Sequence, residues 1–232
     1  MATSGTATFS MNFTELAEEA YERAGREMRT GYDLRTARRS FNLLTIEWNN
    51  RGLNMWSIDQ GTISLVAGTA TYSLPADTVD LLEHVVRTGA GVESTQTDIN
   101  VNRISVSTYA AIPNKLTQAQ PLQIVVNRLA TPTVTLWPVP NAAQAYQLIY
   151  WRMRRLEDAG TGVNTQDVVY RFYPAMAAGL AYYIAMKEPE LVERLGMLKA
   201  EYEEQFDLAA SEDREKAPIR WIPQRQFIGR RS

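Results

Sequence analysis

The first hydrophobic pattern along the chain has the spacing of one helix face. Apolar side chains recur at steps of three and four residues from Phe13 to Met28, which is the period of an amphipathic helix. Asn12 and Glu15 are spaced like a capping box that starts this helix, and Gly31 is placed to end it. The spacing therefore predicts a helix that begins after Asn12 and stops at Gly31.

A second helical pattern follows at once. Asp33 is placed to cap this helix and Gly52 to end it. The apolar positions between them, again at steps of three and four, are Leu34, Ala37, Phe41, Leu44 and Trp48. The first two helices are therefore predicted to form an antiparallel hairpin.

Between Ser57 and Arg155 the apolar period changes from that of a helix to that of a strand. Apolar residues two positions apart, typical of half-buried strands, occur at Ile63/Leu65, Tyr72/Leu74, Ile124/Val126, Val134/Leu136 and Leu148/Tyr150. Turn-forming residues separate these runs, at Gly68, Gly89, Gly91, Pro121, Pro132, Pro138 and Pro140. The region is predicted to be a mostly antiparallel sheet.

Helical spacing returns after a linker that contains Gly160, Gly162 and Asn164. The segment from about Pro174 to Met186 is apolar almost all round and is predicted to be the central helix. A fourth helix is predicted to begin near Pro189, with an apolar stripe at Leu191, Leu195, Leu198, Tyr202, Phe206 and Ala209. Its polar side, which meets solvent or a neighbour, carries Glu190, Glu193, Lys199, Glu203 and Glu204.

These patterns predict an α+β fold in which a helical body of about four helices carries an inserted, mostly antiparallel β domain. The last segment has no periodicity, yet it interleaves apolar residues with arginines and is too apolar for a solvated linker. It is predicted to be an extended C-terminal arm. The predicted divisions are a helical hairpin at 12–56, the β domain at 57–158, helices that complete the body at 164–216 and the arm at 217–232.

Composition narrows the function classes. The chain is 45% hydrophobic and 22% charged, which is typical of a folded globular protein. A formal net charge of −2 gives little reason to bind phosphates, so tight autonomous DNA binding is disfavoured. Cysteine is absent, which excludes disulfides and thiolate metal sites. The start of the chain lacks the basic and apolar regions of a secretory signal, and the most apolar stretch is shorter than the about 20 residues of a membrane span.

Few residues suit catalysis. The only histidine is His84, in a strand-like stretch, where a lone histidine is more often structural than catalytic. Adjacent carboxylates on a helix, such as Glu18/Glu19 and Glu203/Glu204, point apart and usually form a solvated face. Asp77/Asp80 is an equally poor candidate for acid and base catalysis. Aromatic residues such as Trp48 and Tyr183 are better explained by burial than by ligand binding. Neither an enzyme activity nor a cofactor is expected.

Arginines cluster in the predicted hairpin and at the end of the β region, at Arg23/Arg26/Arg29, Arg35/Arg38/Arg39 and Arg152/Arg154/Arg155. The guanidinium fork suits carboxylate and phosphate alike, so contact with acidic neighbours or with DNA is one interpretation. A solvated face paired with nearby glutamates is at least as good an interpretation of any one cluster. Sequence leaves both open.

Several segments, in their order and spacing, carry a resemblance to a known family. They are Glu18-Glu19-Ala-Tyr-Glu-Arg-Ala-Gly25, Gly31-Tyr-Asp-Leu-Arg-Thr-Ala-Arg-Arg-Ser40, Glu47-Trp-Asn-Asn-Arg-Gly-Leu53, Tyr72-Ser-Leu-Pro-Ala-Asp77 and Leu136-Trp-Pro-Val-Pro140. Over nearly its whole length the chain resembles the head-to-tail adaptor family of short-tailed bacteriophages, the group that includes tail tubular protein A. None of these segments is a catalytic motif.

The resemblance implies a structural virion protein of the neck, assembled in the host cytoplasm. Its copies would form a ring, expected to be dodecameric, between the portal protein and the tail nozzle, which is the tail tubular protein B-like component. The ring would extend the channel for genomic DNA without sequence-specific binding. The resemblance implies no enzyme activity, no cofactor and no membrane span.

In such adaptors a C-terminal arm reaches into the portal, which gives the segment 217–232 a role. Aromatic residues and arginine are the usual anchors of interfaces, so the expected portal-binding residues are Arg220, Trp221, Ile222, Pro223, Arg225, Phe227, Ile228, Arg230 and Arg231. Contacts within a ring join different faces of neighbouring subunits. The candidate subunit interface sets the acidic side of the fourth helix against Arg23, Arg26, Arg35, Arg38 and Arg39.

Two alternatives remain at this point. The arginine-bearing hairpin could belong to a nucleic-acid-binding regulator, which would require a basic surface on an acidic chain. The chain could also be a phage cell-wall hydrolase, which would require a glutamate of raised pKa in a cleft.

Overall fold

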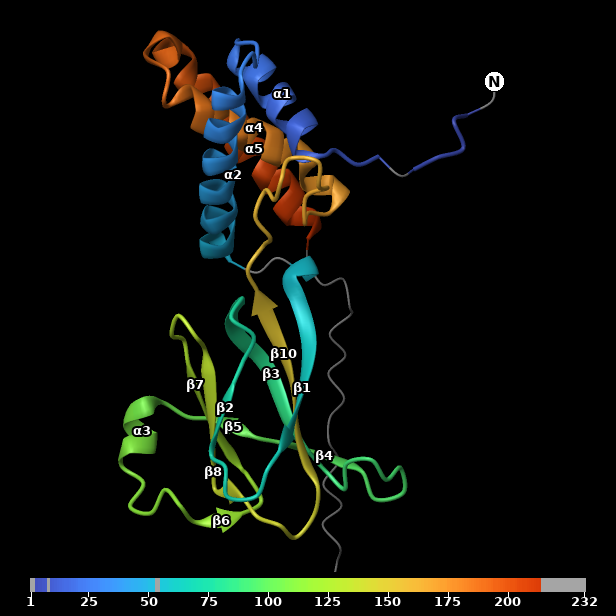
Figure 1. Ribbon diagram of the computed structural model, residues 1–232, viewed down its shortest axis with the longest axis vertical. Helices are drawn as coiled ribbons and strands as arrows, with labels where there is room; N and C mark the ends of the chain where they lie inside the picture. The colour runs from blue at the N-terminus through green and yellow to red at the C-terminus, as the bar shows by residue number, and fades with distance from the viewer. Residues whose placement is uncertain (1–2, 8, 53–54, 214–232) are drawn as a thin grey trace, which may run out of the picture.

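In the computed structural model, which describes residues 3–7, 9–52 and 55–213, the four long helices gather at one end of the molecule, and the strands lie at the other end together with one short helix (Figure 1). The helices are α1 (Phe13–Ala24), α2 (Gly31–Arg51), the short α3 (Val106–Ala110), α4 (Tyr173–Ala185) and α5 (Leu195–Glu212). Within these ranges, 3-10 turns lie at Met55–Ser57, Tyr170–Phe172 and Pro189–Arg194. The predicted α+β fold, a helical body with a β region inserted between its helices, is confirmed. The predicted arm lies outside the described residues.

α1 begins where the sequence predicts but ends earlier. The capping box is confirmed, because Asn12 Oδ1 accepts the Glu15 N–H at 2.9 Å and Glu15 Oε2 accepts the Asn12 N–H at 2.9 Å. The expected stop at Gly31 is wrong. Gly25 adopts the left-handed conformation, with φ of 90°, and its N–H donates to the Glu22 carbonyl at 2.9 Å. This C-cap provides a hydrogen bond for a carbonyl of the last turn, so α1 ends at Gly25 and not at Gly31.

α2 begins before its predicted cap, Asp33. Thr30 is the N-cap, and Asp33 is the third helical residue, whose carboxylate accepts the Thr30 N–H at 3.0 Å. Asp33 therefore completes a capping box and does not itself cap the helix. The predicted stop at Gly52 is confirmed, and α1 and α2 run in opposite directions, as expected of a hairpin (Figure 1).

α4 is the centre of the helical body, as its apolar composition predicts. α1, α2 and α5 all pack against it, and most of its side chains are buried. At Gly179 a Cβ atom would lie 2.8 Å from the Tyr202 ring and 3.0 Å from Leu44 Cδ1. The missing side chain therefore allows α5 and α2 to approach α4 closely.

The predicted fourth helix is confirmed with a different first turn. Its expected start near Pro189 is a 3-10 turn, and the α-helical part begins at Leu195. The expected apolar stripe is partly buried at Leu195 and buried at Leu191, Leu198, Tyr202, Phe206 and Ala209. Among the described residues, no helix is long and apolar enough to cross a membrane.

The strands form two four-stranded sheets and one short pair. Their bounds are β1 (Ile58–Leu65), β2 (Thr71–Ser73), β3 (Thr78–Thr88), β4 (Thr97–Asn100), β5 (Asn102–Arg103), β6 (Gln118–Ala119), β7 (Gln123–Asn127), β8 (Thr133–Trp137), β9 (Val139–Pro140) and β10 (Tyr146–Arg154). The strand orders are β1-β10-β3-β4, β2-β8-β7-β5 and β6-β9. The pairing is antiparallel except between β5 and β7 and between β6 and β9, which are parallel.

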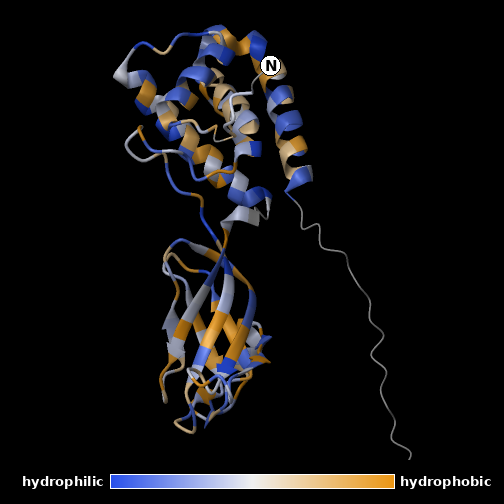
Figure 2. Cartoon of the chain, turned by 90° about the vertical axis from the view of Figure 1, so that its right-hand side faces the viewer, coloured by the Kyte–Doolittle hydropathy of each residue, from blue (hydrophilic) through white to orange (hydrophobic). Residues whose placement is uncertain are grey.

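Apolar side chains from both four-stranded sheets meet in one core, separate from the core of the helical body. Every residue of the predicted alternating pairs lies in this core or packs against it. Figure 2 shows hydrophobic residues along these strands. The period-two pattern therefore identified the inner faces of the sheets correctly.

The β lobe leaves and rejoins the helical body through adjacent strands. Ile58, the first residue of β1, pairs with Met153 near the end of β10. Trp56 Nε1 donates to the Asp167 carbonyl at 3.2 Å, and Arg154 Nη2 donates to Asp167 Oδ1 at 2.9 Å. The Arg154 guanidinium lowers the pKa of Asp167. Both chain connections between the lobe and the helical body are thus hydrogen-bonded to the segment that leads into α4. The expected domain limits stay a prediction.

Candidate functional site

The arginines predicted for a subunit interface fall into two groups, and the first group is used within the chain. Arg23 Nε contacts Glu19 Oε1 at 2.7 Å, and its Nη1 contacts Glu201 Oε1 at 2.9 Å. Arg26 pairs with Glu188. Arg23 therefore ties α1 to α5, and Arg26 ties the loop after α1 to the turn after α4.

Arg35, Arg38 and Arg39 form the second group, on the first half of α2. In the ranges that the structure describes, none of them makes an ion pair, and Arg39 makes one long hydrogen bond of 3.4 Å to Thr36. Arg35 and Arg39 are exposed and Arg38 is half-buried. Together with Tyr32, which is more than half exposed, they line an open hollow.

Two apolar residues extend this surface along α2. Leu43 and Ile46 are each more than half exposed to solvent. Helix positions separated by three or four residues share one side of a helix, and the exposed side of α2 has this spacing. Its members, called here the basic face of α2, are Tyr32, Arg35, Arg39, Leu43 and Ile46.

α5 has an outward side of the opposite charge. Met197 and Leu208 are more than half exposed, although both are large apolar residues. Glu204 and Asp207 are exposed, and neither makes an ion pair in the described part of the chain. All four lie opposite the buried stripe of α5. They are called here the acidic face of α5.

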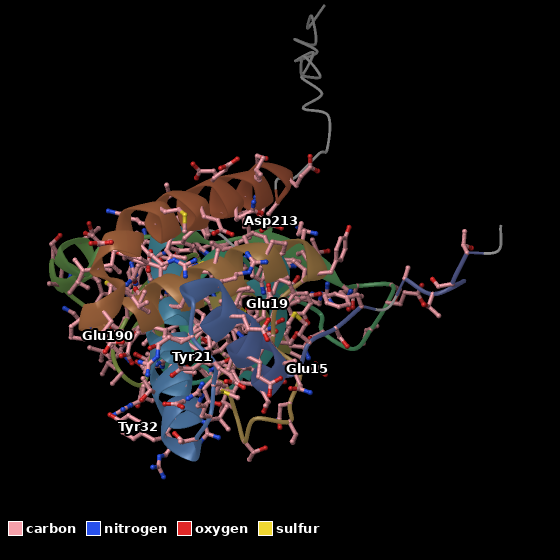
Figure 3. The ribbon with its side chains drawn as sticks, turned by 90° about the horizontal axis from the view of Figure 1, so that it is seen from above. Glu15, Glu19, Tyr21, Tyr32, Glu190 and Asp213 are labelled. Carbon is pink, nitrogen blue, oxygen red and sulfur yellow. The ribbon has the colours of Figure 1, made fainter. Side chains whose placement is uncertain are left out.

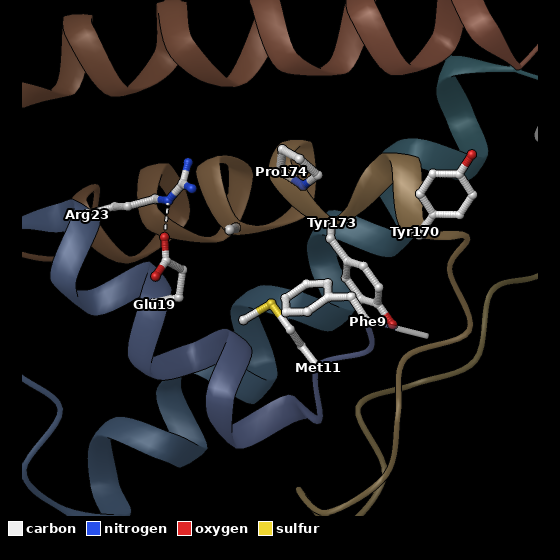
Figure 4. Close-up of a pocket in the computed structure, with 8 residues that line it drawn as sticks. Phe9, Met11, Glu19, Arg23, Tyr170, Tyr173 and Pro174 are labelled. Atoms are coloured by element: carbon white, nitrogen blue, oxygen red, sulfur yellow. Dashed lines mark hydrogen bonds and ion pairs between the residues drawn. The ribbon is translucent and has the colours of Figure 1, made fainter. Parts of the chain in front are cut away.

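A partly apolar hollow of about 340 Å³ lies between α1, the segment before it and the start of α4 (Figure 4). Phe9 packs edge-on against Tyr173, with 6.1 Å between the ring centroids. The charged groups in the lining, Glu19 and Arg23, are paired with each other. Such a lining suits an apolar side chain better than a reaction. The sequence did not indicate this hollow, because Phe9 lies in a Ser/Thr/Ala-rich start without periodicity.

Buried and partly buried hydrogen bonds hold α2, α4 and α5 together. Trp48 Nε1 donates to Tyr202 Oη at 2.9 Å, and Tyr202 Oη donates to Glu47 at 3.1 Å. The Tyr183 hydroxyl donates to the same carboxylate at 2.6 Å, and burial together with Glu47 raises the pKa of Tyr183 to about 12. The expected burial of Trp48 is confirmed. This network links α2 and α5, the two helices that carry the charged faces.

Burial or arginine contacts set the pKa values of groups considered for catalysis. Both ring nitrogens of His84 are buried, and this burial lowers the pKa of His84, while the backbone of Val101 opposes the shift. Hydrogen bonds from Arg152 and Arg51 lower the pKa values of Asp77 and Glu203, whereas a glycosidase acid needs a raised pKa. The described residues include no group of three or more histidines and carboxylates that could hold a metal ion.

The residues expected to bind the portal, Arg220, Trp221, Ile222, Pro223, Arg225, Phe227, Ile228, Arg230 and Arg231, lie outside the described residues. Residues 11–222 match the family described as SU10 adaptor protein, and this match includes the beginning of that segment. No curated protein matches the chain. The family match extends through the helical body, the β lobe and the beginning of the expected arm. The chain therefore belongs to the SU10 adaptor protein family, which confirms its resemblance to phage head-to-tail adaptors.

Proposed function

We propose that copies of this adaptor form a ring between the portal protein and the tail nozzle, where the ring extends the channel for genomic DNA. The observation that carries the proposal is the family match over residues 11–222. The arrangement of the chain supports it, because a helical body and a β lobe with separate cores lie at opposite ends (Figure 1). One copy thus offers a different surface to each of two partners. The ring is proposed to be dodecameric, to assemble in the host cytoplasm and to lie in the neck of the virion.

The portal side of the ring is proposed to be held by the segment 217–232. Its composition supports this role, because arginine, tryptophan and phenylalanine are the side chains that most often anchor interfaces. The last described residue, Asp213, pairs with Arg171 just before α4, so the segment continues from a defined point of the helical body. A single short arm binds modestly, but arms linked in a ring bind together with high avidity.

The chain is proposed to act without catalysis and without a cofactor. Its family is one of structural phage adaptors, and the ionisable pairs of the helical body serve as links between helices. DNA is proposed to pass through the ring without sequence-specific contact. The net charge of −2 supports this, because tight DNA binding requires many cationic contacts with phosphates.

Co-sedimentation with the intact portal ring of the same phage tests the proposal. Full-length protein is expected to sediment with the portal, a chain ending at Lys216 to stay in the supernatant, and Trp221→Ala/Phe227→Ala to bind more weakly with an unchanged circular dichroism spectrum. If full-length protein does not bind, the adaptor ring is excluded. Retention of duplex DNA at physiological salt and a peptidoglycan zymogram would then distinguish the regulator from the hydrolase.

A further inference from the structure

Two oppositely charged helix faces have no partner inside the helical body. The basic face of α2 carries Arg35 and Arg39, and the acidic face of α5 carries Glu204 and Asp207. None of these four residues makes an ion pair in the ranges described, although neighbouring arginines such as Arg23 do. Each face also exposes large apolar residues beside its charges. Exposed apolar side chains arranged around unpaired charges are typical of surfaces that meet another protein.

The two faces lie at opposite edges of the helical body. In the view from above, α5 runs along one edge, and α2 lies at the other edge with Tyr32 directed away from the body (Figure 3). α4 lies between them, since both helices pack against it. The two faces of one chain therefore cannot satisfy each other. Faces on opposite sides of a subunit make a heterologous contact, and a contact of this type repeats around a ring when the rotation closes.

We propose that the basic face of α2 docks on the acidic face of α5 in the next copy of the chain. The inference rests on the proposed function, because the ring supplies the next copy. The charges meet in the middle of the contact, where they select the correct faces and speed their encounter. The apolar residues lie on either side of the charges along each helix and bury apolar surface there. Lys199, which is exposed on the flank of α5, lies outside the acidic face. Arg23 and Arg26, which were also predicted for the interface, are excluded from this contact because they pair with Glu201 and Glu188 of their own chain.

Charge exchange between the faces gives a test that uses the whole protein. Variant A, Arg35→Glu/Arg39→Glu, has two acidic faces, and variant B, Glu204→Arg/Asp207→Arg, has two basic faces. Neither variant can satisfy the contact with copies of itself. In an equal mixture, however, every contact of an alternating ring again joins an acidic face to a basic one. The control Glu93→Arg/Glu157→Arg makes the same charge change as variant B at exposed positions of other segments.

The readout is the number of copies bound per portal ring, measured by mass photometry at increasing protein concentration, with circular dichroism to verify folding. Each variant alone is expected to need an about tenfold or higher concentration to fill the ring, because like charges placed face to face oppose association. The mixture and the control should fill it as the wild type does. Equal filling by A or B alone, or no recovery in the mixture, overturns this inference only. Absence of wild-type protein from the portal overturns the proposed function itself.

Discussion

Gly179→Ala is expected to destabilise the helical body, although alanine favours helices. Gly179 faces Tyr202 of α5 and Leu44 of α2 from the middle of α4. A new Cβ would lie 2.8 Å from the tyrosine ring and 3.0 Å from Leu44 Cδ1, closer than carbon atoms pack. The ring cannot retreat freely, because the Tyr202 hydroxyl is hydrogen-bonded to Trp48 and Glu47.

Three contributions determine how much Gly179→Ala changes the free energy of unfolding. Replacing glycine by alanine inside a helix stabilises it by about 1 kcal/mol. Forcing an extra carbon into a packed core costs about 1–3 kcal/mol, and shifting the Tyr202 hydroxyl from its partners costs about 1 kcal/mol more. We therefore expect the free energy of unfolding to fall by about 1–3 kcal/mol.

Urea unfolding followed by far-UV circular dichroism measures this change, because the four long helices all belong to the helical body. The matched control is Gly196→Ala in α5, where a new Cβ meets no atom within 4 Å. This control should show the helix contribution alone, a stabilisation of at most about 1 kcal/mol because Gly196 lies in the first turn of α5. If Gly179→Ala stabilised the protein as much as Gly196→Ala does, the close approach of α5 and α2 to α4 would be refuted.

Two further predictions concern the junction and the β lobe. Asp167→Asn removes the charged acceptor of Arg154 between the lobes and should cost about 1.5–3 kcal/mol locally. Trypsin should then cut after Arg155 about 10- to 150-fold faster, and an unchanged rate would contradict the linking role. Burial lowers the pKa of His84 in the folded state, so the unfolded chain binds the proton first as the pH falls. The free energy of unfolding is therefore unaffected by His84 above the unfolded pKa of about 6.5 and declines below it. The melting temperature should therefore fall from pH 7.5 to pH 5.5 in the wild type and less in His84→Leu, and equal slopes would count against this.

Local signals in the sequence predicted the elements whose causes are local. The capping box of Asn12 and Glu15 starts α1 as expected, since both partners lie within one turn. The end of α1 is not predicted because the apolar spacing continues to Met28, whereas Gly25 ends the helix through its left-handed conformation, with φ of 90°. Glycine also leaves room there for a distant arginine. A Cβ at Gly25 would lie 1.9 Å from Nη1 of Arg194, a contact that no local pattern contains.

The same distinction applies to the β region. Strands with alternating apolar residues were found, whereas two-residue strands such as Asn102–Arg103 have too few positions for any period. Their parallel pairing with strands further along the chain follows from topology and not from composition. Short elements of this kind need the assembled sheet to define them.

Sequence located the candidate interface only in part. It identified the arginines of the hairpin, but Glu201, the partner of Arg23, lies 178 residues away. Only the fold therefore separates arginines that bind their own chain from arginines that remain free. The exposed Leu43 and Leu208 carry a signal that sequence does contain, because both fall off the apolar stripe of their helix.

Many copies of this adaptor are proposed to bind one portal. Weighing the complex that forms between an intact portal ring and an excess of full-length protein tests this stoichiometry. We expect the mass to increase by one 26.2 kDa chain for every portal subunit. A mass that stays at that of the portal, or that rises by only one or two chains, would contradict it.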